Sequence, residues 1–357
     1  MTTTNWKAFL AEKGAHFKDS HLLSFGNPEQ AELENTLLAQ GDVLFDLSDT
    51  SIIKVSGEDA ESFLQNQLTN DIRNISETSH QTSAWCSPKG RIIASFRAFK
   101  QQDSYFLTVS SDLLEHVIKK LSMYVMMSKV TIEDVTDSYA FFAYAGKEAD
   151  NNLQGIISKD NDNEESKLAS EDNQTSKYKS LSILRISSKT KIPSFQIFGE
   201  LDDAKQLWEA CSVTAKPASS THFSYLNILA GLPVITKPSS EKWIPQMVNF
   251  IAVDGVDFKK GCYPGQEVVA RLNYLGKTKR RMYRIEIDTE KLPAVNDTIT
   301  SASDTAAGQI LNTALNPEGK VEALAILKIA EAEKQLTLAD NKNASITLLE
   351  LPYSLEE

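Results

Sequence analysis

The sequence predicts an α+β fold that is followed by a small, separate β-barrel or β-sandwich. Between residues 51 and 211, short apolar strand patterns alternate with amphipathic helical patterns, and neighbouring strands are joined by polar turns. This order is typical of an α+β protein rather than of a doubly wound parallel sheet. From Arg281 onward, short apolar runs alternate with Gly, Pro, Asn and Asp, which is the pattern of a small all-β unit. A chain of 357 residues is long enough for two or three packed units.

The first of these strands follows a polar lead-in with a helical pattern. Residues 51–55, SIIKV, are predicted to form a strand. Ser56 is predicted to cap the next helix, with Asp59 as its partner in a capping box. That helix has one apolar stripe, formed by Ala60, Phe63, Leu64 and Leu68.

The next elements are two strands, a helix and a further strand. Residues 91–99 and 105–109 are predicted strands joined across a polar turn. Residues 111–126 carry apolar side chains at helical spacing, and residues 130–135 are a predicted strand. Met123, Met126 and the adjacent Met127 are assigned to this helix, and its apolar stripe predicts that they lie in the core rather than bind a ligand.

Residues 159–179 are polar and nearly devoid of large apolar side chains. Such a segment buries too little surface to offset its ordering entropy, so a mobile loop is predicted. Strands at 181–186 and 195–200 and a helix around 202–210 follow. The predicted units are residues 1–145, an N-terminal α+β portion, residues 146–275, a second α+β portion, and residues 276–357, the C-terminal barrel.

Composition excludes several classes of function. Lys and Arg number 37 against 48 Asp and Glu, which gives a formal charge of −11 and argues against strong direct nucleic-acid binding. The chain has no apolar run of 18 residues, so no membrane association is expected. Three cysteines, Cys86, Cys211 and Cys262, predict a reducing, cytoplasmic location rather than a disulfide framework. Their spacing supports no structural zinc site and no complete iron–sulfur site, so no metal ligand is assigned.

The densest chemistry lies at residues 254–271, DGVDFKKGCYPGQEVVAR. The pattern predicts a loop, a tight turn and a helix, with Gly261 allowing close backbone approach and Gly265 adopting a positive φ. Glu267 is expected in the first turn of the helix, where its charge suits the dipole. Cys262 follows two lysines, and positive potential with nearby amide donors favours a thiolate of lowered pKa. The pattern leaves open a second interpretation, a small buried cysteine that fills space.

A cysteine hydrolase would need a histidine as base. None of the histidines stands in a recognisable catalytic signature, although a distant one could fold close to the thiol. These residues are His16, His21, His80, His116 and His222.

Residues 243–271, WIPQMVNFIAVDGVDFKKGCYPGQEVVAR, closely resemble the signature of the folate-binding YgfZ family. That family shares a superfamily with the aminomethyltransferase (T protein) of the glycine cleavage system. The likeness extends through residues 226–235, 55–72 and 87–99, and it also covers SKVTIEDV and the terminal LPYSLEE. It therefore covers most of the chain and leaves out mainly residues 159–179.

The resemblance implies an aminomethyltransferase-like folate-binding fold, with two α+β portions around a central cavity and a C-terminal β-barrel. It implies tetrahydrofolate, or a one-carbon derivative, in that cavity. It also implies a role in assembling or maintaining iron–sulfur proteins, including radical enzymes that thiomethylate tRNA. The expected partners are therefore folate and either iron–sulfur client enzymes or cluster-assembly proteins.

The resemblance also assigns site residues in the motif. It implies that Cys262 is the key thiol, and that the neighbouring motif residues Lys260, Tyr263, Gln266 and Glu267 act with it. Cofactor contacts are predicted from Gly261, Gly265 and Arg271.

Four residues outside the motif are further candidates for cofactor binding. Lys89 and Arg91 stand at a turn that leads into a strand, where they could meet the glutamate tail of folate or form a solvated hairpin. Gln246 and Asn249 are amides that could pair with a pterin through donors and acceptors. A basic cluster could attract polyglutamylated folate, RNA or an acidic protein, or remain a solvated face. The cluster comprises Lys277, Lys279, Arg280, Arg281 and Arg284.

Two departures from the superfamily bear on activity. Where aminomethyltransferases carry aspartates beside the folate, this chain has Ala94 and Ser95, which argues against glycine-cleavage chemistry. Leu229 stands where the family usually has a glutamate that could accept hydrogen bonds from the pterin. The leading hypothesis is a folate-binding accessory protein for iron–sulfur enzymes that acts through Cys262 beside a tetrahydrofolate cavity. The alternatives are a folate-dependent one-carbon transferase and a binding module that takes no folate.

Overall fold

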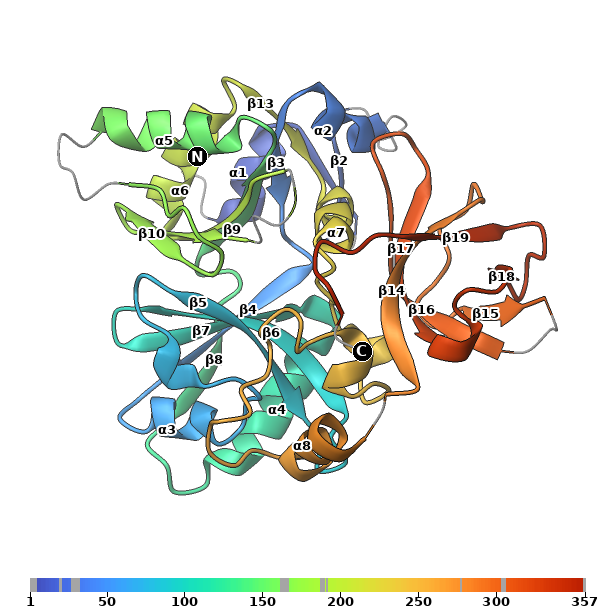
Figure 1. Cartoon of the computed structure of the whole chain (residues 1–357). Coiled ribbons are helices and arrows are strands. Elements are labelled where there is room, and N and C mark those ends of the chain that lie inside the picture. Colours follow the sequence, from blue (N-terminus) through green and yellow to red (C-terminus); the bar gives the residue numbers. More distant parts are fainter. Residues whose placement is uncertain are drawn as a thin grey trace.

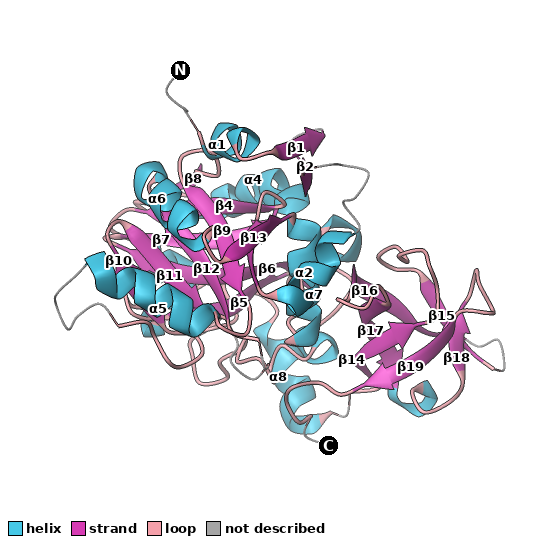
Figure 2. Ribbon diagram, turned by 90° about the horizontal axis from the view of Figure 1, so that it is seen from above, coloured by secondary structure: helices cyan, strands magenta, loops and turns pink. Residues whose placement is uncertain are grey.

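The chain folds into two α+β units that lie one above the other, with a β-barrel to one side (Figure 1). The computed structural model describes residues 5–18, 21–26, 33–160, 167–186, 190, 192–276, 278–302 and 306–355. The two large sheets face each other, and helices cover their outer faces (Figures 1 and 2). Aromatic side chains pack between the sheets, with Phe106 and Phe198 at 4.8 Å and Phe99 and Phe198 at 5.0 Å between ring centroids. The predicted α+β class is confirmed.

The lower unit contains a five-stranded antiparallel sheet in the order β5-β6-β7-β4-β8. Helices α3 (Ala60–Gln65) and α4 (Leu114–Val125) pack on its outer face (Figure 1). The strands predicted at 51–55, 91–99, 105–109 and 130–135 are all present. They correspond to β4 Thr50–Ser56, β6 Ile92–Gln101, β7 Ser104–Ser110 and β8 Thr131–Asp134. The fifth strand, β5 His80–Cys86, was not predicted.

The upper unit contains a six-stranded sheet in the order β10-β11-β12-β9-β3-β13, in which only the β13–β3 pair is parallel. Helices α1 (Trp6–Glu12), α5 (Ala149–Asp160) and α6 (Leu201–Cys211) lie over it, on the side away from the lower unit (Figure 2). The strands are β3 Asp42–Asp46, β9 Ala140–Ala145, β10 Thr175–Tyr178, β11 Leu181–Arg185, β12 Ser194–Gly199 and β13 Ala215–Ala218.

Strands β3 and β9 are neighbours in this sheet, although the whole five-stranded sheet separates them in sequence. The upper sheet therefore combines strands from both sides of residue 145. The predicted unit boundaries stay a prediction.

The C-terminal region forms a closed barrel in the order β14-β17-β16-β15-β18-β19. Of the two all-β forms that the sequence allowed, the barrel is thus the one observed. Its interior is filled by aliphatic side chains such as Ile285, Ile310 and Leu327. The strands are β14 Arg280–Ile287, β15 Thr298–Ser301, β16 Ala306–Leu315, β17 Val321–Lys328, β18 Leu336–Leu338 and β19 Ser345–Leu349.

The remaining elements connect these units. Helix α7 (Ser220–Leu229) packs between the upper unit and the barrel, and α8 (Gln266–Leu275) follows the motif (Figure 1). A small antiparallel pair, β1 (Ala15–Lys18) and β2 (His21–Phe25), and the short helix α2 (Leu37–Gln40) complete the N-terminal region. No helix in the described parts of the chain combines the length and apolar character that crossing a bilayer requires.

The predicted capping box at the start of α3 is wrong. Ser56 is the last residue of β4, and the chain turns at Gly57, whose φ is 112°. The N-cap residue is Asp59, which makes no side-chain cap. Its carboxylate instead accepts a hydrogen bond from the backbone N–H of Lys129 at 2.7 Å. The Asp59 side chain therefore bonds to Lys129, which is distant in sequence, instead of to Ser56, the predicted cap of the helix.

The prediction of a loop over residues 159–179 is wrong at both ends. Helix α5 continues to Asp160, and β10 occupies residues 175–178, while residues 161–166 lie outside the described chain. Strand β10 is held by its pairing with β11 at the edge of the sheet, with Thr175 and Tyr178 buried. Main-chain pairing thus orders a segment that has little apolar surface of its own.

The prediction that three methionines lie in the core is also wrong. Met123, Met126 and Met127 are 71%, 88% and 96% exposed. The buried stripe of α4 consists of Val117 and Leu121, and the helix ends at Val125. Met126 has a φ of 43°, so the chain has left the helical path there and the stripe no longer continues.

Candidate functional site

The motif loop joins α8 at Gly265, which has a φ of 82° as the sequence predicts. A Cβ atom at Gly265 would lie 2.4 Å from the carbonyl oxygen of Ser87 and 2.7 Å from the Cα of Gly90. The motif therefore packs closely against the turn between β5 and β6. The close approach predicted at Gly261 is wrong, because a Cβ there would meet open space.

Lys260 is buried, with 6% of its surface exposed. Its ammonium donates to the carbonyl oxygens of Gln65, at 2.7 Å, of Leu68, and of Asn70, at 3.0 Å. Burial lowers the pKa of Lys260 to about 8, while the nearby carboxylates of Asp71 and Asp257 act in the opposite direction. The ammonium has three protons, so all of its donors are used by main-chain oxygens.

Further hydrogen bonds fix the motif loop to the segment that follows α3. The Thr69 hydroxyl donates to the Gly255 carbonyl at 2.7 Å, and the Asp257 N–H donates to the Thr69 carbonyl at 3.0 Å. The Asn70 amide donates to the Asp254 carbonyl at 2.6 Å. The loop that presents the motif is thus held by several independent bonds to one neighbouring segment.

Cys262 is exposed, whereas the other two cysteines of the chain, both within the described residues, are buried. Burial raises the pKa of Cys86 and of Cys211 to about 12, so both are inert at neutral pH. The interpretation of Cys262 as a buried filler is therefore wrong. The predicted thiolate character of Cys262 stays a prediction.

The other side chains of the motif differ in their exposure. Tyr263 is buried, its ring lies 5.3 Å from the Lys260 ammonium, and burial raises the pKa of its hydroxyl. Glu267 is exposed in the first turn of α8, as predicted, and Gln266 is half-buried beside it. Arg271 is exposed one turn further along the helix.

The predicted residues outside the motif fall into two groups. Lys89 is exposed on the β5–β6 turn, and the Arg91 guanidinium donates to the Lys242 carbonyl. The Gln246 amide donates to the Val269 carbonyl of α8 at 2.6 Å, so these three residues lie near the motif. Asn249 is different, because its amide donates to the Met282 carbonyl of the barrel at 2.9 Å.

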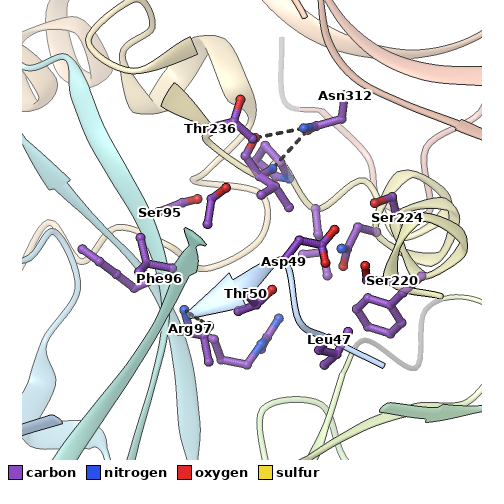
Figure 3. Close-up of a pocket in the computed structure, with 18 of the residues that line it drawn as sticks. Leu47, Asp49, Thr50, Ser95, Phe96, Arg97, Ser220, Ser224, Thr236 and Asn312 are labelled. Carbon is purple, nitrogen blue, oxygen red and sulfur yellow. Dashed lines mark hydrogen bonds between the residues drawn. The ribbon is translucent and has the colours of Figure 1, made fainter. Parts of the chain in front are cut away.

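The principal pocket lies elsewhere and has a volume of about 310 Å³. The five-stranded sheet, helix α7, the linker after α7 and the barrel all contribute to its wall (Figure 3). None of the site residues predicted from the sequence lines it. The pocket and the motif loop are therefore two separate parts of the molecule, and the predicted role of the motif in cofactor binding stays a prediction.

The sheet contributes rows of polar side chains to the pocket. Thr82 on β5, Arg97 on β6 and Thr108 on β7 are directly opposite one another in register. Ser95 lies two residues before Arg97, so it faces the same side, and Ser110 pairs with Thr50 in the next row. On β6 and β7, these positions alternate with buried apolar ones. Each of these strands therefore directs polar side chains toward the pocket from one face of the sheet and packs apolar side chains in the core on the other face.

Helix α7 contributes one face to the opposite wall. Ser220, Phe223, Ser224 and Asn227 line the pocket, and their spacing of three, four and seven residues places them on one side of the helix. Leu229 is not among the lining residues and packs against the core instead. The substitution of leucine for the usual glutamate therefore does not alter the wall of this pocket.

The barrel and the linker close one end of the pocket. The Asn312 side chain accepts a hydrogen bond from the Val234 N–H at 3.1 Å and donates to the Val234 carbonyl at 2.9 Å. The Ser95 hydroxyl accepts a hydrogen bond from the Ile235 N–H at 3.0 Å. An amide on the barrel thus binds the linker as a neighbouring strand would.

The two charged side chains that line the pocket within the described residues, Asp49 and Arg97, were not predicted as site residues. Ser95, which stands where aminomethyltransferases carry an aspartate, lines the pocket, and Ala94 is fully buried. The carboxylate comes instead from Asp49, which lies between the strand residues and Ser220 and Ser224 of α7 (Figure 3). The sequence feature that could have indicated Asp49 is its position in a short polar link between two apolar strands.

Comparison with known proteins identifies the family. The GCVT N-terminal domain model matches residues 15–227. A "tRNA-modifying protein YgfZ" from Colwellia psychrerythraea (strain 34H) is 30% identical over 332 residues, which is 92% of this chain and 96% of the relative. The protein of the same name from Enterobacter sp. (strain 638) is 30% identical over 318 residues, 88% of this chain and 94% of the relative. The chain belongs to the YgfZ family.

The fold of this YgfZ family member is shared with an aminomethyltransferase. The glycine cleavage system aminomethyltransferase T from Bartonella henselae superposes with a TM-score of 0.72 at 15% identity, covering 96% of this chain and 95% of that one. The aminomethyltransferase-like fold implied by the resemblance is therefore confirmed.

Proposed function

We propose that this protein binds a reduced folate in the pocket and acts as an accessory protein in the assembly or repair of iron–sulfur enzymes, including enzymes that modify tRNA. The name of the relatives, tRNA-modifying protein, supports the last part. The aminomethyltransferase-like fold supports a folate-type ligand. The observation that carries the proposal is the pocket itself, whose polar rows, aromatic ring from Phe223 and carboxylate from Asp49 suit a pterin.

The lining residues fit tetrahydrofolate in size and in chemistry. Pockets for ligands of this kind have volumes of roughly 300–1,000 Å³, and this one lies at the lower end of that range. A pterin has N–H donors and ring acceptors along its edges. Asp49 would accept from the donors, and Asn227 offers both an acceptor and donors. Phe223 would cover apolar ring surface and exclude water.

Cys262 would act from the surface, on a partner protein, rather than on the folate. Its thiol is exposed, and Lys260 and Asn70 help to hold the loop that presents it. The described residues include no cluster of three or more His, Cys, Asp and Glu side chains arranged to hold a metal ion. We therefore propose that cluster iron belongs to the partner.

The β5–β6 hairpin would connect the two parts. Its strands supply Thr82, Ser95 and Arg97 to the pocket, and its turn packs against the motif through Gly90 and Gly265. A ligand that shifts these strands would also shift the turn on which the motif rests.

The ligand part of this proposal is tested by calorimetric titration of the protein with tetrahydrofolate under anaerobic conditions. We expect saturable binding that is weakened by Asp49→Ala. The absence of heat at millimolar ligand would remove folate from the proposal.

The accessory part is tested in cells that lack this protein, by measuring thiomethylated nucleosides in their tRNA. We expect the wild-type chain to restore the modification and Cys262→Ala to fail while remaining folded at wild-type abundance. Full restoration by Cys262→Ala would show that the thiol has no part in the function.

Asp49 also favours a second candidate, a folate-dependent one-carbon transferase. The loss of the acid at residues 94 and 95 argued against this activity, but the pocket retains a carboxylate from another element. The decisive assay follows transfer of a formaldehyde-equivalent from methylene-tetrahydrofolate to an amine or thiol acceptor. Turnover that Asp49→Asn abolishes would establish the transferase.

A further inference from the structure

Arg97 is the only cationic side chain among the described residues that line the pocket. It lies in the middle of the polar row formed with Thr82 and Thr108. In the close-up, Arg97 lies at one end of the pocket and Asn312 and Thr236 at the other, with Asp49 between them (Figure 3). The pocket is therefore polarised along its length.

The Arg97 guanidinium has a neutral neighbour instead of a counter-ion. One of its nitrogens, Nη1, lies 3.2 Å from Nδ1 of His80, and Nε2 of His80 lies 3.0 Å from the Arg185 carbonyl. Since an arginine can only donate, His80 accepts at Nδ1 and donates from Nε2 to the carbonyl. Burial and the adjacent guanidinium both lower the pKa of His80 well below its usual range, so the imidazole remains neutral.

Arg97 keeps its charge in this environment. Burial lowers its pKa to about 10, which leaves the guanidinium protonated at neutral pH, and attraction from Asp172 opposes the shift. Asp172 is not a lining residue, and within the described chain Arg97 has no carboxylate at ion-pairing distance. A guanidinium carries five N–H donors, of which His80 takes one.

Arg97 is half-buried, and a cation that is partly withdrawn from water without a carboxylate at ion-pairing distance is unfavourable. We infer that Arg97 binds a carboxylate of the ligand, namely the glutamyl end of the folate, and that His80 is a positioning residue that orients the guanidinium. This inference rests on the proposed folate function and adds the orientation of the ligand. The pterin lies toward Asp49 and Asn312, and the carboxylate lies against Arg97.

The experiment compares two ligands in calorimetric titrations. Tetrahydrofolate carries the glutamyl carboxylates, whereas 6-methyltetrahydropterin has the ring alone. We expect Arg97→Met to weaken tetrahydrofolate binding by about 30-fold or more, the usual effect of removing one partner of a buried charge pair. The affinity for 6-methyltetrahydropterin should change by less than about 3-fold, because that ligand makes no use of the charge. Lys100→Met is the matched control, since it removes a cation from the same strand outside the pocket lining and should leave both affinities unchanged.

Two further variants keep the test decisive if Arg97→Met does not fold. Arg97→Lys retains the charge without the planar fork, so it should lose tetrahydrofolate affinity by a smaller factor and still spare the ring-only ligand. His80→Ala removes the neutral acceptor and should show the same selectivity. Equal losses for the two ligands would mean that Arg97 contacts the ring, and unchanged tetrahydrofolate affinity would mean that it contacts no ligand. Either result overturns the inference. If the wild-type protein binds neither ligand, the folate function itself fails, and the inference fails with it.

Discussion

At the scale of single residues, Lys260 illustrates how a residue of a functional motif can have a structural task. Its ammonium donates to three carbonyl oxygens, one at the end of α3 and two in the segment that follows. Because all three protons of this ammonium are engaged in hydrogen bonds, Lys260 is not free to act as a general acid or a general base. The lysine instead fixes the position of the residue two places further on, Cys262.

We expect Lys260→Met to destabilise the protein by about 2–4 kcal/mol, because it leaves buried carbonyl oxygens without donors. Urea unfolding monitored by tryptophan fluorescence measures this. Lys259→Met is the control, since Lys259 is exposed, and its effect should stay within about 0.5 kcal/mol. Equal effects of the two substitutions would show that the three hydrogen bonds contribute nothing.

The three thiols should differ sharply in reactivity. Iodoacetamide at neutral pH is expected to add one label per native chain, at Cys262, because Cys86 and Cys211 are buried with raised pKa values. Cys262→Ala should change the free energy of unfolding by less than about 1–2 kcal/mol. Peptide mass spectrometry before and after denaturation locates the labels. Modification of all three thiols in the native state would show that Cys86 and Cys211 are not buried.

His80 makes stability depend on pH in a defined direction. Its pKa is lowered in the folded protein, so below about pH 6.5 the unfolded chain binds a proton that the native protein does not bind. Stability from this residue is therefore lost as the pH falls from about 7 toward 5. Thermal unfolding of the wild type should show a steeper loss over this range than His80→Gln. Parallel curves would show that the imidazole titrates normally. Asp46, whose pKa burial raises to about 6, titrates in both proteins and cancels in the comparison.

At the scale of elements, the same substitution, glycine to alanine, should have different effects on stability at the two glycines of the motif. Gly265→Ala should cost about 2 kcal/mol or more, because the backbone has a positive φ and the added Cβ would clash with the Ser87 carbonyl. Gly261→Ala should cost less than about 1 kcal/mol, because the new methyl group meets open space. Chemical denaturation of the two variants provides the comparison. A larger effect at Gly261 would show that the loop is packed differently.

The regular elements could be predicted from local patterns because period and polarity are local properties. Four of the five strands of the lower sheet and the positive φ of Gly265 follow from side-chain alternation and turn chemistry, whereas β5 was not predicted. The errors arose where a distant partner decides the outcome. Asp59 bonds to Lys129 rather than to its own helix, and β10 is ordered by β11.

The site was predicted less well than the fold, for the same reason. The motif could be recognised because its residues are contiguous. The pocket is assembled from β5–β7, α7, the linker and the barrel, so no single stretch of sequence reveals it. Arg97 and Thr82 are opposite one another only after the strands have paired. Helical spacing predicts that Ser220, Phe223, Ser224 and Asn227 share one side of α7. It does not predict which part of the molecule that side packs against.

At the scale of the whole molecule, the barrel contributes to the wall of the pocket and is not an independent domain at its side. Asn312 binds the linker through both its carbonyl and its amide. We expect Asn312→Ala to lower stability by about 1–3 kcal/mol and to weaken ligand binding, because two main-chain groups of Val234 lose their partner. Asn343→Ala, at an exposed position of the same barrel, should change neither quantity. Ligand titration and thermal unfolding measure both effects, and unaltered binding in Asn312→Ala would show that the barrel closes the pocket without this bond.

The placement of β3 beside β9 has a consequence for the chain as it leaves the ribosome. The lower unit lies wholly between these two strands in sequence, so it can complete its sheet while β3 still lacks both of its neighbours. Until residues 140–145 and 215–218 have been synthesised, the apolar strand Asp42–Asp46 exposes two unpaired edges. The nascent chain therefore passes through a stage in which a segment that is fully buried in the native protein is open to chaperones or to other chains.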